Sequence, residues 1–286
     1  MAGPRGKWRM IPFDFAYHRA ASLAEAVETY AQANQEGLKP AYLAGGTEIT
    51  TFCRMGKLKP GALVDIKRIP ECRARVVEGN ELVFGAALTL NEVIEGDSFP
   101  LLRQASVLVD HTVRNRLTLG GNIAGMLPYR ETVLPFLLAD ATARLVSPAG
   151  ERRVSLAEVF SERLLLGSGE LLAQIRVPKA QVSRAWFYRR RVRKGRFDYP
   201  LVTVFCLRVN HVLRMAVAGA FGFPLRCREA EKALNDGAIP LPKRPRAVVA
   251  AIPHPIVEDM RASAAYRRML LEKCVGEALE VLKQVK

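Results

Sequence analysis

Hydrophobic and polar positions alternate with helical spacing behind three similar start signals. Each signal is a serine or threonine followed three positions later by a glutamate, which is the capping box that opens many helices. The three begin at Ser22, Thr89 and Ser155, and the first helix should continue to about Gln35. The sequence therefore predicts three helix starts.

Short apolar runs follow the first predicted helix. Residues 40–44 and 62–66 have the length and composition of buried strands, and a mixed polar and apolar segment, residues 49–55, connects them. Strand, glycine turn, crossover and strand predict a βαβ-like unit. Because open α/β sheets bind ligands where their strands end, the glycines after residue 44 lie at a predicted binding edge.

The rest of the chain favours antiparallel strands and further helices. Turns at Gly79-Asn80 and Asn210-His211 separate strand-like segments. Helices are expected from about Arg226 to Gly237 and from about Ala262 onward. The predicted strands cover residues 75–78, 81–86, 144–147, 152–154, 171–177, 201–209 and 212–221, in addition to a basic and aromatic strand within residues 184–196.

This pattern divides the chain into three parts. Residues 1–60 form the N-terminal βαβ-like part of a first domain, and residues 61–179 form its α+β part. Residues 180–286 form a separate C-terminal domain of antiparallel sheet and helices. The predicted fold class is α+β.

Composition limits the function classes. The chain has 286 residues, 49% of them hydrophobic and 25% charged, so it can bury more than one core. No window approaches the ~18 apolar residues of a membrane span, and the basic N-terminus lacks an apolar signal segment. We therefore expect a cytoplasmic protein without a membrane partner. Five scattered cysteines without metal-binding spacing indicate a reducing compartment and no metal site in this chain.

The net charge of +15 raises the alternative of nucleic-acid binding. Arginines alternate with aromatic side chains within residues 184–196, but no known nucleic-acid-binding motif accompanies them. A basic surface that faces an acidic partner or an anionic cofactor is the favoured interpretation, with no nucleic acid as partner.

Two glycine pairs indicate what that anion is. Gly45-Gly46 and Gly120-Gly121 each follow an apolar run, and each precedes a small polar residue. Glycine allows positive φ and lets backbone N–H groups approach an anion closely. The two pairs predict a pyrophosphate site with two walls.

These glycine loops and several other segments, in order, resemble the FAD-binding subunits of molybdenum hydroxylases, the family of xanthine dehydrogenase and carbon monoxide dehydrogenase. The resemblance implies a two-subdomain FAD-binding domain of the vanillyl-alcohol-oxidase or PCMH type, followed by a C-terminal antiparallel sheet-and-helix domain. The absence of a G-x-G-x-x-G motif agrees with this fold and not with a Rossmann fold. The similar segments are residues 43–48, 63–66, 113–124, 169–172, 177–178, 197–199 and 262–268.

The resemblance also implies which residues bind FAD. One wall would wrap the pyrophosphate and ribityl chain, and the other would face it. N–H dipoles and the Thr47 and Thr118 hydroxyls would neutralise the phosphates. The first wall consists of Leu43, Ala44, Gly45, Gly46, Thr47, Glu48 and Ile49, and the second of Thr118, Leu119, Gly120, Gly121 and Asn122.

Four further positions follow from the resemblance, each with an alternative. Leu108 and Leu172 would contact the flavin or adenine, or would be core leucines. Glu131 stands where the family has an aspartate that binds a flavin-side hydroxyl; alternatively it is solvated and paired with Arg130. Arg190 would keep the positive charge of a family lysine beside the flavin, or would face solvent or another subunit.

The implied function is electron transfer. A molybdopterin-binding large subunit would hydroxylate a substrate, a small subunit with [2Fe–2S] clusters would relay electrons, and this chain's FAD would pass them to NAD+ or another acceptor. Residues 128–135 resemble the purine-hydroxylase branch more than the carbon monoxide branch. No catalytic acid, base or nucleophile is expected here, because the flavin supplies the redox chemistry. The alternatives are a stand-alone flavin reductase with the same fold and a basic nucleic-acid-binding protein.

Overall fold

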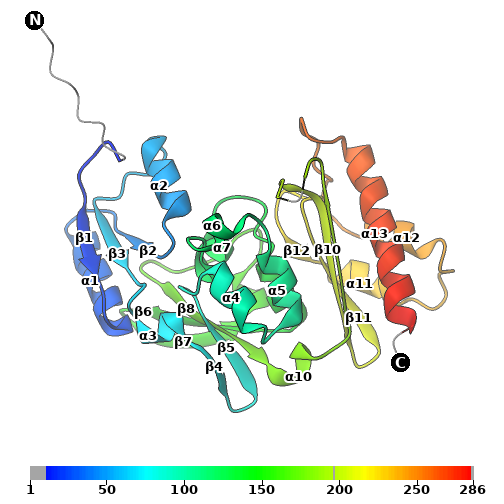
Figure 1. Cartoon of the computed structure of the whole chain (residues 1–286), viewed down its shortest axis with the longest axis horizontal. Helices are drawn as coiled ribbons and strands as arrows, with labels where there is room; N and C mark the ends of the chain where they lie inside the picture. The colour runs from blue at the N-terminus through cyan, green and yellow to red at the C-terminus, as the bar shows by residue number, and fades with distance from the viewer. Residues whose placement is uncertain (1–10, 196, 285–286) are drawn as a thin grey trace, which may run out of the picture.

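Three sheets lie side by side along the molecule, in the order in which the chain forms them (Figure 1). A computed structural model describes residues 11–195 and 197–284. The basic N-terminus and Arg196, the last residue of the predicted basic strand segment, lie outside the described residues. Among the described residues, no helix is long and apolar enough to cross a membrane.

The first sheet is parallel and has three strands. Its order is β1 (Ala16–Arg19), β3 (Ala62–Asp65) and β2 (Ala41–Leu43). Helix α1 (Leu23–Gln35) leads into β2, and α2 (Thr47–Arg54) crosses from β2 to β3. The predicted βαβ unit is therefore present, with a helix as its crossover.

The second sheet is antiparallel and has the order β4-β5-β8-β6-β7. The predicted Gly79-Asn80 turn joins β4 to β5, which pair as a hairpin, and the predicted strands at residues 144–147 and 152–154 lie in β6 and β7, which also pair. The strands are β4 (Arg75–Glu78), β5 (Glu81–Gly85), β6 (Thr142–Ser147), β7 (Gly150–Ser155) and β8 (Leu171–Pro178). Short helices accompany them: α3 (Pro70–Arg73), α4 (Leu90–Gly96), α5 (Pro100–Ser106), α6 (His111–Arg114), α7 (Leu119–Ala124), α8 (Val133–Leu138), α9 (Leu156–Val159) and α10 (Lys179–Val182).

The third sheet is antiparallel and has the order β12-β11-β10-β9. The predicted Asn210-His211 turn joins β10 to β11, and both residues have positive φ. The strands are β9 (Trp186–Val192), β10 (Pro200–Val209), β11 (Val212–Ala218) and β12 (Leu225–Arg226). The helices are α11 (Arg228–Asn235), α12 (Arg244–Ala250) and α13 (Ala264–Gln284).

The capping predictions have mixed outcomes. Thr89 forms the complete box with Glu92, and Ser22 accepts from the Glu25 N–H, although the Glu25 side chain accepts from Ala21. The third helix start is also present, because the four-residue α9 begins after Ser155 as its N-cap, but the capping box is not formed. Ser155 ends β7, where it pairs with Thr142 of β6, and its side chain caps no N–H group. The predicted division at residue 60 remains a prediction, although β3 on its far side pairs with β1 and β2.

Apolar packing joins the three sheets. One core cluster lies between α1, the first sheet and the second sheet. A larger cluster joins the second sheet and its helices to one face of β10 and β11, including Phe205 and Leu207. The alternate residues of the same strands, including Val204 and Cys206, pack against α11, α12 and α13. The C-terminal sheet is thus covered on both faces.

A buried arginine anchors the last helix to this sheet. Arg267 on α13 is 0% exposed and donates to the Leu201 and Gly219 carbonyls at 2.9 and 2.8 Å, and to Asp259 at 2.7 Å. Its neighbour Arg268 is exposed. The two adjacent arginines therefore have different surroundings, one buried and hydrogen-bonded and the other exposed.

We expect Arg267→Met to lower the free energy of unfolding by ~3 kcal/mol, because two buried carbonyls and Asp259 lose a charged partner. Arg268→Met on the same helix should change it by less than ~0.5 kcal/mol. Chemical denaturation of both variants measures the difference. Equal stability of the two variants would contradict the anchoring role.

Candidate functional site

The first glycine loop ends in a helix with open N–H groups. Gly46 is the N-cap of α2, with φ of +72°, and it has no side chain to cap the helix. Among the described residues, no protein acceptor takes the N–H groups of Gly45, Gly46, Thr47, Glu48 and Ile49. Open N–H groups at a helix N-terminus favour phosphate oxygens, because the helix dipole adds to the hydrogen bonds.

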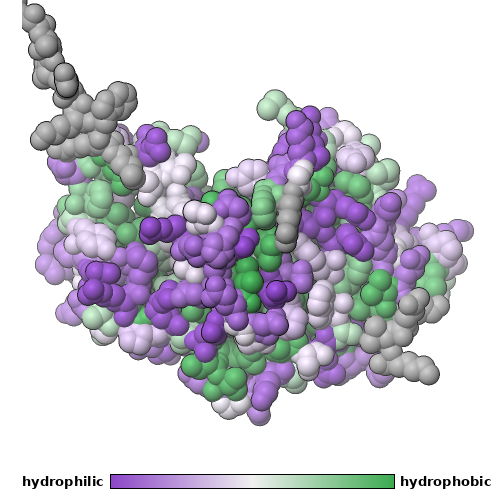
Figure 2. All heavy atoms as spheres, in the orientation of Figure 1, coloured by the Kyte–Doolittle hydropathy of each residue, from purple (hydrophilic) through white to green (hydrophobic). Residues whose placement is uncertain are grey.

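The two glycine loops touch each other. A Cβ built on Gly45 would lie 1.9 Å from the Arg116 carbonyl oxygen and 3.3 Å from the Thr118 nitrogen. Only a residue without a Cβ allows this approach. The structure therefore brings together the two walls that the sequence predicts. In Figure 2 the outline of the molecule dips over α6 and α7, between the parts that contain α2 and β10.

The second wall differs from the prediction in its donors. The Thr118 hydroxyl is buried and accepts from the Gly121 N–H at 3.2 Å, so it caps α7. The N–H groups of Leu119, Gly120 and Asn122 donate to backbone carbonyls. The expectation that this loop offers many N–H groups to phosphate is wrong, because folding uses them internally. The Thr118 O–H stays a predicted donor, since the oxygen acts only as an acceptor in its bond with Gly121. Open backbone N–H groups are thus found in the first wall rather than in the second.

Glu48 ties the first wall to the segment after the second one. Its Oε1 accepts from the Met126 N–H at 2.6 Å, and its Oε2 would lie 3.1 Å from a Cβ on Gly125. The carboxylate is therefore bonded to Met126 and lies close to Gly125. This contact sets the relative position of the two loops at their far end.

Asp65 and Lys67 hold the start of the first loop. Asp65 is 1% exposed and accepts from the Lys67 ammonium at 2.7 Å and from the Tyr17 hydroxyl. Lys67 also donates to the Ala44 carbonyl at 3.1 Å. Burial alone would raise the pKa of Asp65, but the hydrogen bonds from Lys67 and Tyr17 outweigh burial and hold it below its usual value. Lys67 was not predicted from the sequence. Its position two residues after Asp65, which allows its ammonium to reach that carboxylate, could have indicated it.

Glu131 and Arg190, which are 59 positions apart, form a buried pair. Glu131 is 1% exposed, and it accepts from the Arg190 Nε at 3.2 Å and from the Thr203 hydroxyl at 2.5 Å. Burial raises the pKa of Glu131, and Arg190 and Thr203 offset part of that rise. The alternatives of a solvated Glu131 and of a pair with Arg130 are wrong. Arg130 donates instead to the Gly125 and Glu162 carbonyls.

The two predicted leucine contacts lie in apolar surroundings. Leu172, on β8, belongs to the large core cluster, and Leu108 is 8% exposed in the turn after α5. Both positions are accounted for by packing, so their contact with flavin remains a prediction. A separate cavity of about 660 Å³ lies between α1 and the β6–β7 hairpin, away from both glycine loops.

The two glycine loops together form a cradle, and a family comparison identifies the cofactor that this cradle would hold. The family model described as the FAD binding domain in molybdopterin dehydrogenase matches residues 13–180. The chain belongs to this family. The resemblance seen in the sequence is therefore confirmed, and the cofactor of this FAD-binding chain is FAD.

Relatives of the FAD-binding chain match over nearly its whole length. The medium chain of carbon monoxide dehydrogenase from Hydrogenophaga pseudoflava is 32% identical, covering 94% of this chain and 97% of the relative. The xanthine dehydrogenase FAD-binding subunit of Escherichia coli is 29% identical, covering 93% and 97%. A solved structure of carbon monoxide dehydrogenase from Hydrogenophaga pseudoflava covers 95% of this chain and 98% of that chain, with a TM-score of 0.84 and 30% identity. The predicted fold is confirmed.

The residues present fit FAD. Five open N–H groups at one helix N-terminus suit a pyrophosphate, and the Gly45 contact leaves no room for a side chain in the cradle. Among the described residues, no group of three or more His, Cys, Asp or Glu side chains could hold a metal ion. Backbone dipoles of the first wall are therefore the main means by which this FAD-binding chain would neutralise the phosphates.

We expect Gly45→Ala to weaken FAD binding at least ~10-fold, or about 1.4 kcal/mol, because the new methyl group must separate the two loops. FAD titration of the deflavinated chain measures this. Gly237→Ala is the matched control, since a Cβ there meets nothing within 4 Å. Unchanged FAD affinity in Gly45→Ala would contradict the role of the loop contact.

We expect Asp65→Asn to lower the free energy of unfolding by ~2 kcal/mol at pH 7. Because the folded-state pKa of Asp65 is lowered, its contribution is present above the unfolded pKa of about 3.9 and is lost as pH falls through the folded pKa. The difference between wild type and variant should therefore shrink below about pH 4. Denaturation across pH, with exposed Glu28→Gln as control, measures it; a constant difference would contradict the assignment.

Proposed function

We propose that this chain is the electron-transfer subunit of a molybdenum hydroxylase and acts as the outlet of the complex. It takes electrons from [2Fe–2S] clusters on a small subunit and passes them to NAD+ or another acceptor. A large subunit binds molybdopterin and hydroxylates the substrate. The name carbon monoxide dehydrogenase medium chain, borne by a relative, supports a place among several subunits.

The observation that supports this proposal best is the joined cradle. Gly45 lies against the Arg116 carbonyl, and the open N–H groups begin at the same glycine. Such a site binds a dinucleotide flavin without supplying a catalytic acid or base. Bound FAD supplies the redox chemistry, and the protein supplies binding, orientation and electrostatics.

The proposed binding residues follow from the geometry. The N–H groups of Gly45 to Ile49 hold the pyrophosphate, with Leu43 and Ala44 leading into the loop. Thr118 to Asn122 form the facing wall. Leu108 and Leu172 would contact the rings of FAD from their buried positions. The described structure supports the first two sets through the loop contact.

The basic strand gives little support to nucleic-acid binding. Arg189 and Arg191 both bond to Glu277 on α13, at 2.7 and 2.5 Å, and Arg190 bonds to Glu131. All three arginines therefore have carboxylate partners within the protein, which reduces the donors that they could offer to a phosphate backbone. The five cysteines are all free and buried, which supports the proposed cytoplasmic location.

The hydroxylated substrate is a separate proposal. We propose the purine branch, supported by residues 128–135 and by the relative named xanthine dehydrogenase FAD-binding subunit. The medium chain of carbon monoxide dehydrogenase is similarly related. Activity of the purified complex on a purine and on carbon monoxide, side by side, distinguishes the two substrates.

Purification of the tagged chain from its own cells tests the proposed function. We expect stoichiometric FAD in this chain, with two further subunits that contain molybdenum and iron by metal analysis. The isolated chain should reduce no substrate. A flavin-bearing chain that purifies alone and turns over a substrate would favour the stand-alone reductase, and a colourless chain that binds DNA tightly would contradict both.

A further inference from the structure

The contact between the FAD-binding part of the chain, before residue 180, and the C-terminal sheet includes a buried ion pair. Glu131 precedes α8, and Arg190 lies on β9. The exposed fractions of their side chains are 2% and 10%. Arg190 also donates to the Asp198 carbonyl at 2.7 Å, which holds the loop between β9 and β10.

A chain of hydrogen bonds connects this pair to the second glycine loop. Asn122, the last residue of that wall, accepts from the Thr132 hydroxyl at 2.6 Å. Thr132 is fully buried and adjacent to Glu131, which accepts from Thr203 on β10. These contacts connect Asn122 to β10 through the adjacent residues Thr132 and Glu131.

An aromatic contact follows the same path. Tyr129, two residues before Glu131, stacks on Tyr199 from the loop before β10, with ring centroids 4.6 Å apart. The Arg261 guanidinium lies 4.8 Å from the Tyr129 ring centroid. Tyr129 and Glu131, the two ends of residues 129–131, therefore both contact the C-terminal part of the chain.

We propose that Glu131 and Arg190 are positioning residues, which fix the segment after the second glycine loop against the C-terminal sheet and so hold the facing wall of the FAD site in place. The inference rests on the proposed function. Removing one charge of a buried pair leaves the other without a partner, whereas removing both leaves no unpaired charge. The effects of the two substitutions should therefore be strongly coupled.

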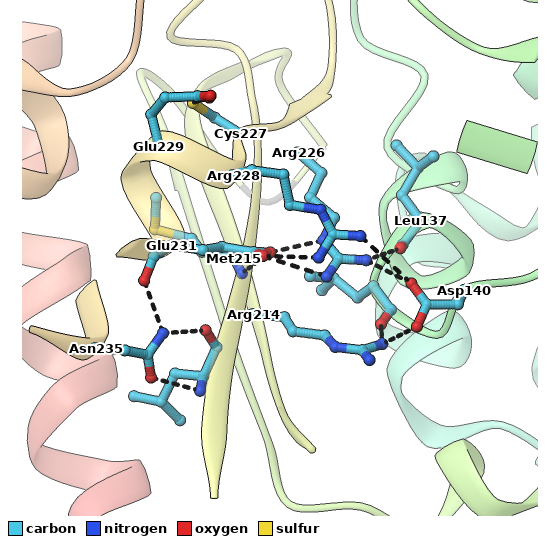
Figure 3. Close-up of polar contacts among 12 residues, drawn as sticks. Leu137, Asp140, Arg214, Met215, Arg226, Cys227, Arg228, Glu229, Glu231 and Asn235 are labelled. Atoms are coloured by element: carbon cyan, nitrogen blue, oxygen red, sulfur yellow. Dashed lines mark hydrogen bonds and ion pairs between the residues drawn. The ribbon is translucent and has the colours of Figure 1, made fainter. Parts of the chain in front are cut away.

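A second polar cluster between the same two parts provides a matched control (Figure 3). Asp140, just after α8, accepts from Arg214 at 2.6 Å and from Arg226 at 2.8 Å, and Arg226 also bonds to Glu231. The two arginines additionally donate to the last carbonyls of α8. Within the described part of the chain, these hydrogen bonds and ion pairs involve neither glycine loop.

The test compares Glu131→Gln, Arg190→Gln, the double variant and Asp140→Asn in the full chain. FAD titration of each deflavinated protein gives affinity, and visible circular dichroism reports how the bound flavin is held. We expect each single variant to lose ~10-fold or more in FAD affinity and to change the flavin dichroism. The double variant should lose no more than the worse single variant, and Asp140→Asn should stay within ~2-fold.

Three results would overturn the proposal. Additive losses would mean that each side chain contacts FAD independently. A similar loss in Asp140→Asn would mean that any weakening of the domain contact has this effect. Unchanged affinity and dichroism in single variants that remain folded by thermal denaturation would mean that the pair does not position the wall. A wild-type chain without FAD affinity would instead contradict the proposed function itself.

Discussion

The proposed FAD site depends on one steric constraint, the approach of Gly45 to the Arg116 carbonyl. A side chain at this position would occupy the space that the second loop fills. The same backbone that makes this contact leads directly into the open N-terminus of α2. One short segment therefore makes the close contact between the loops and carries the N–H groups that we propose for anion binding.

Polar groups keep that segment in place from several sides. Asp65 holds Lys67 against the Ala44 carbonyl, Glu48 holds Met126, and Glu131 joins the second wall to the C-terminal sheet. Asp65 and Glu131 are buried, so each would be costly to leave without its partner. A high positive charge is accommodated in the same way, because many arginines on strands and helices bond to carboxylates or carbonyls within the protein.

Local signals in the sequence predicted local structure well. The hairpins, α1, the Thr89 capping box and the Asn210-His211 turn depend on neighbouring residues, and all are present. Strand β1 was missed because all four of its residues are exposed, so it has no alternating pattern. The Ser155 box failed because pairing with another strand overrode it.

The candidate site was predictable in its position but not in its donors. Glycine spacing and the family resemblance indicated both walls, and the structure brings them together at Gly45. That Thr118 caps its own helix, and that Glu131 pairs with a residue on a distant strand, depends on tertiary contacts absent from any short motif.

A crystal structure of the chain with bound FAD tests the central claim most directly. We expect pyrophosphate oxygens within hydrogen-bond distance of the N–H groups of Gly45 to Ile49, with the Gly45 contact to Arg116 intact. A pyrophosphate held elsewhere, or loops that separate when FAD binds, would contradict it.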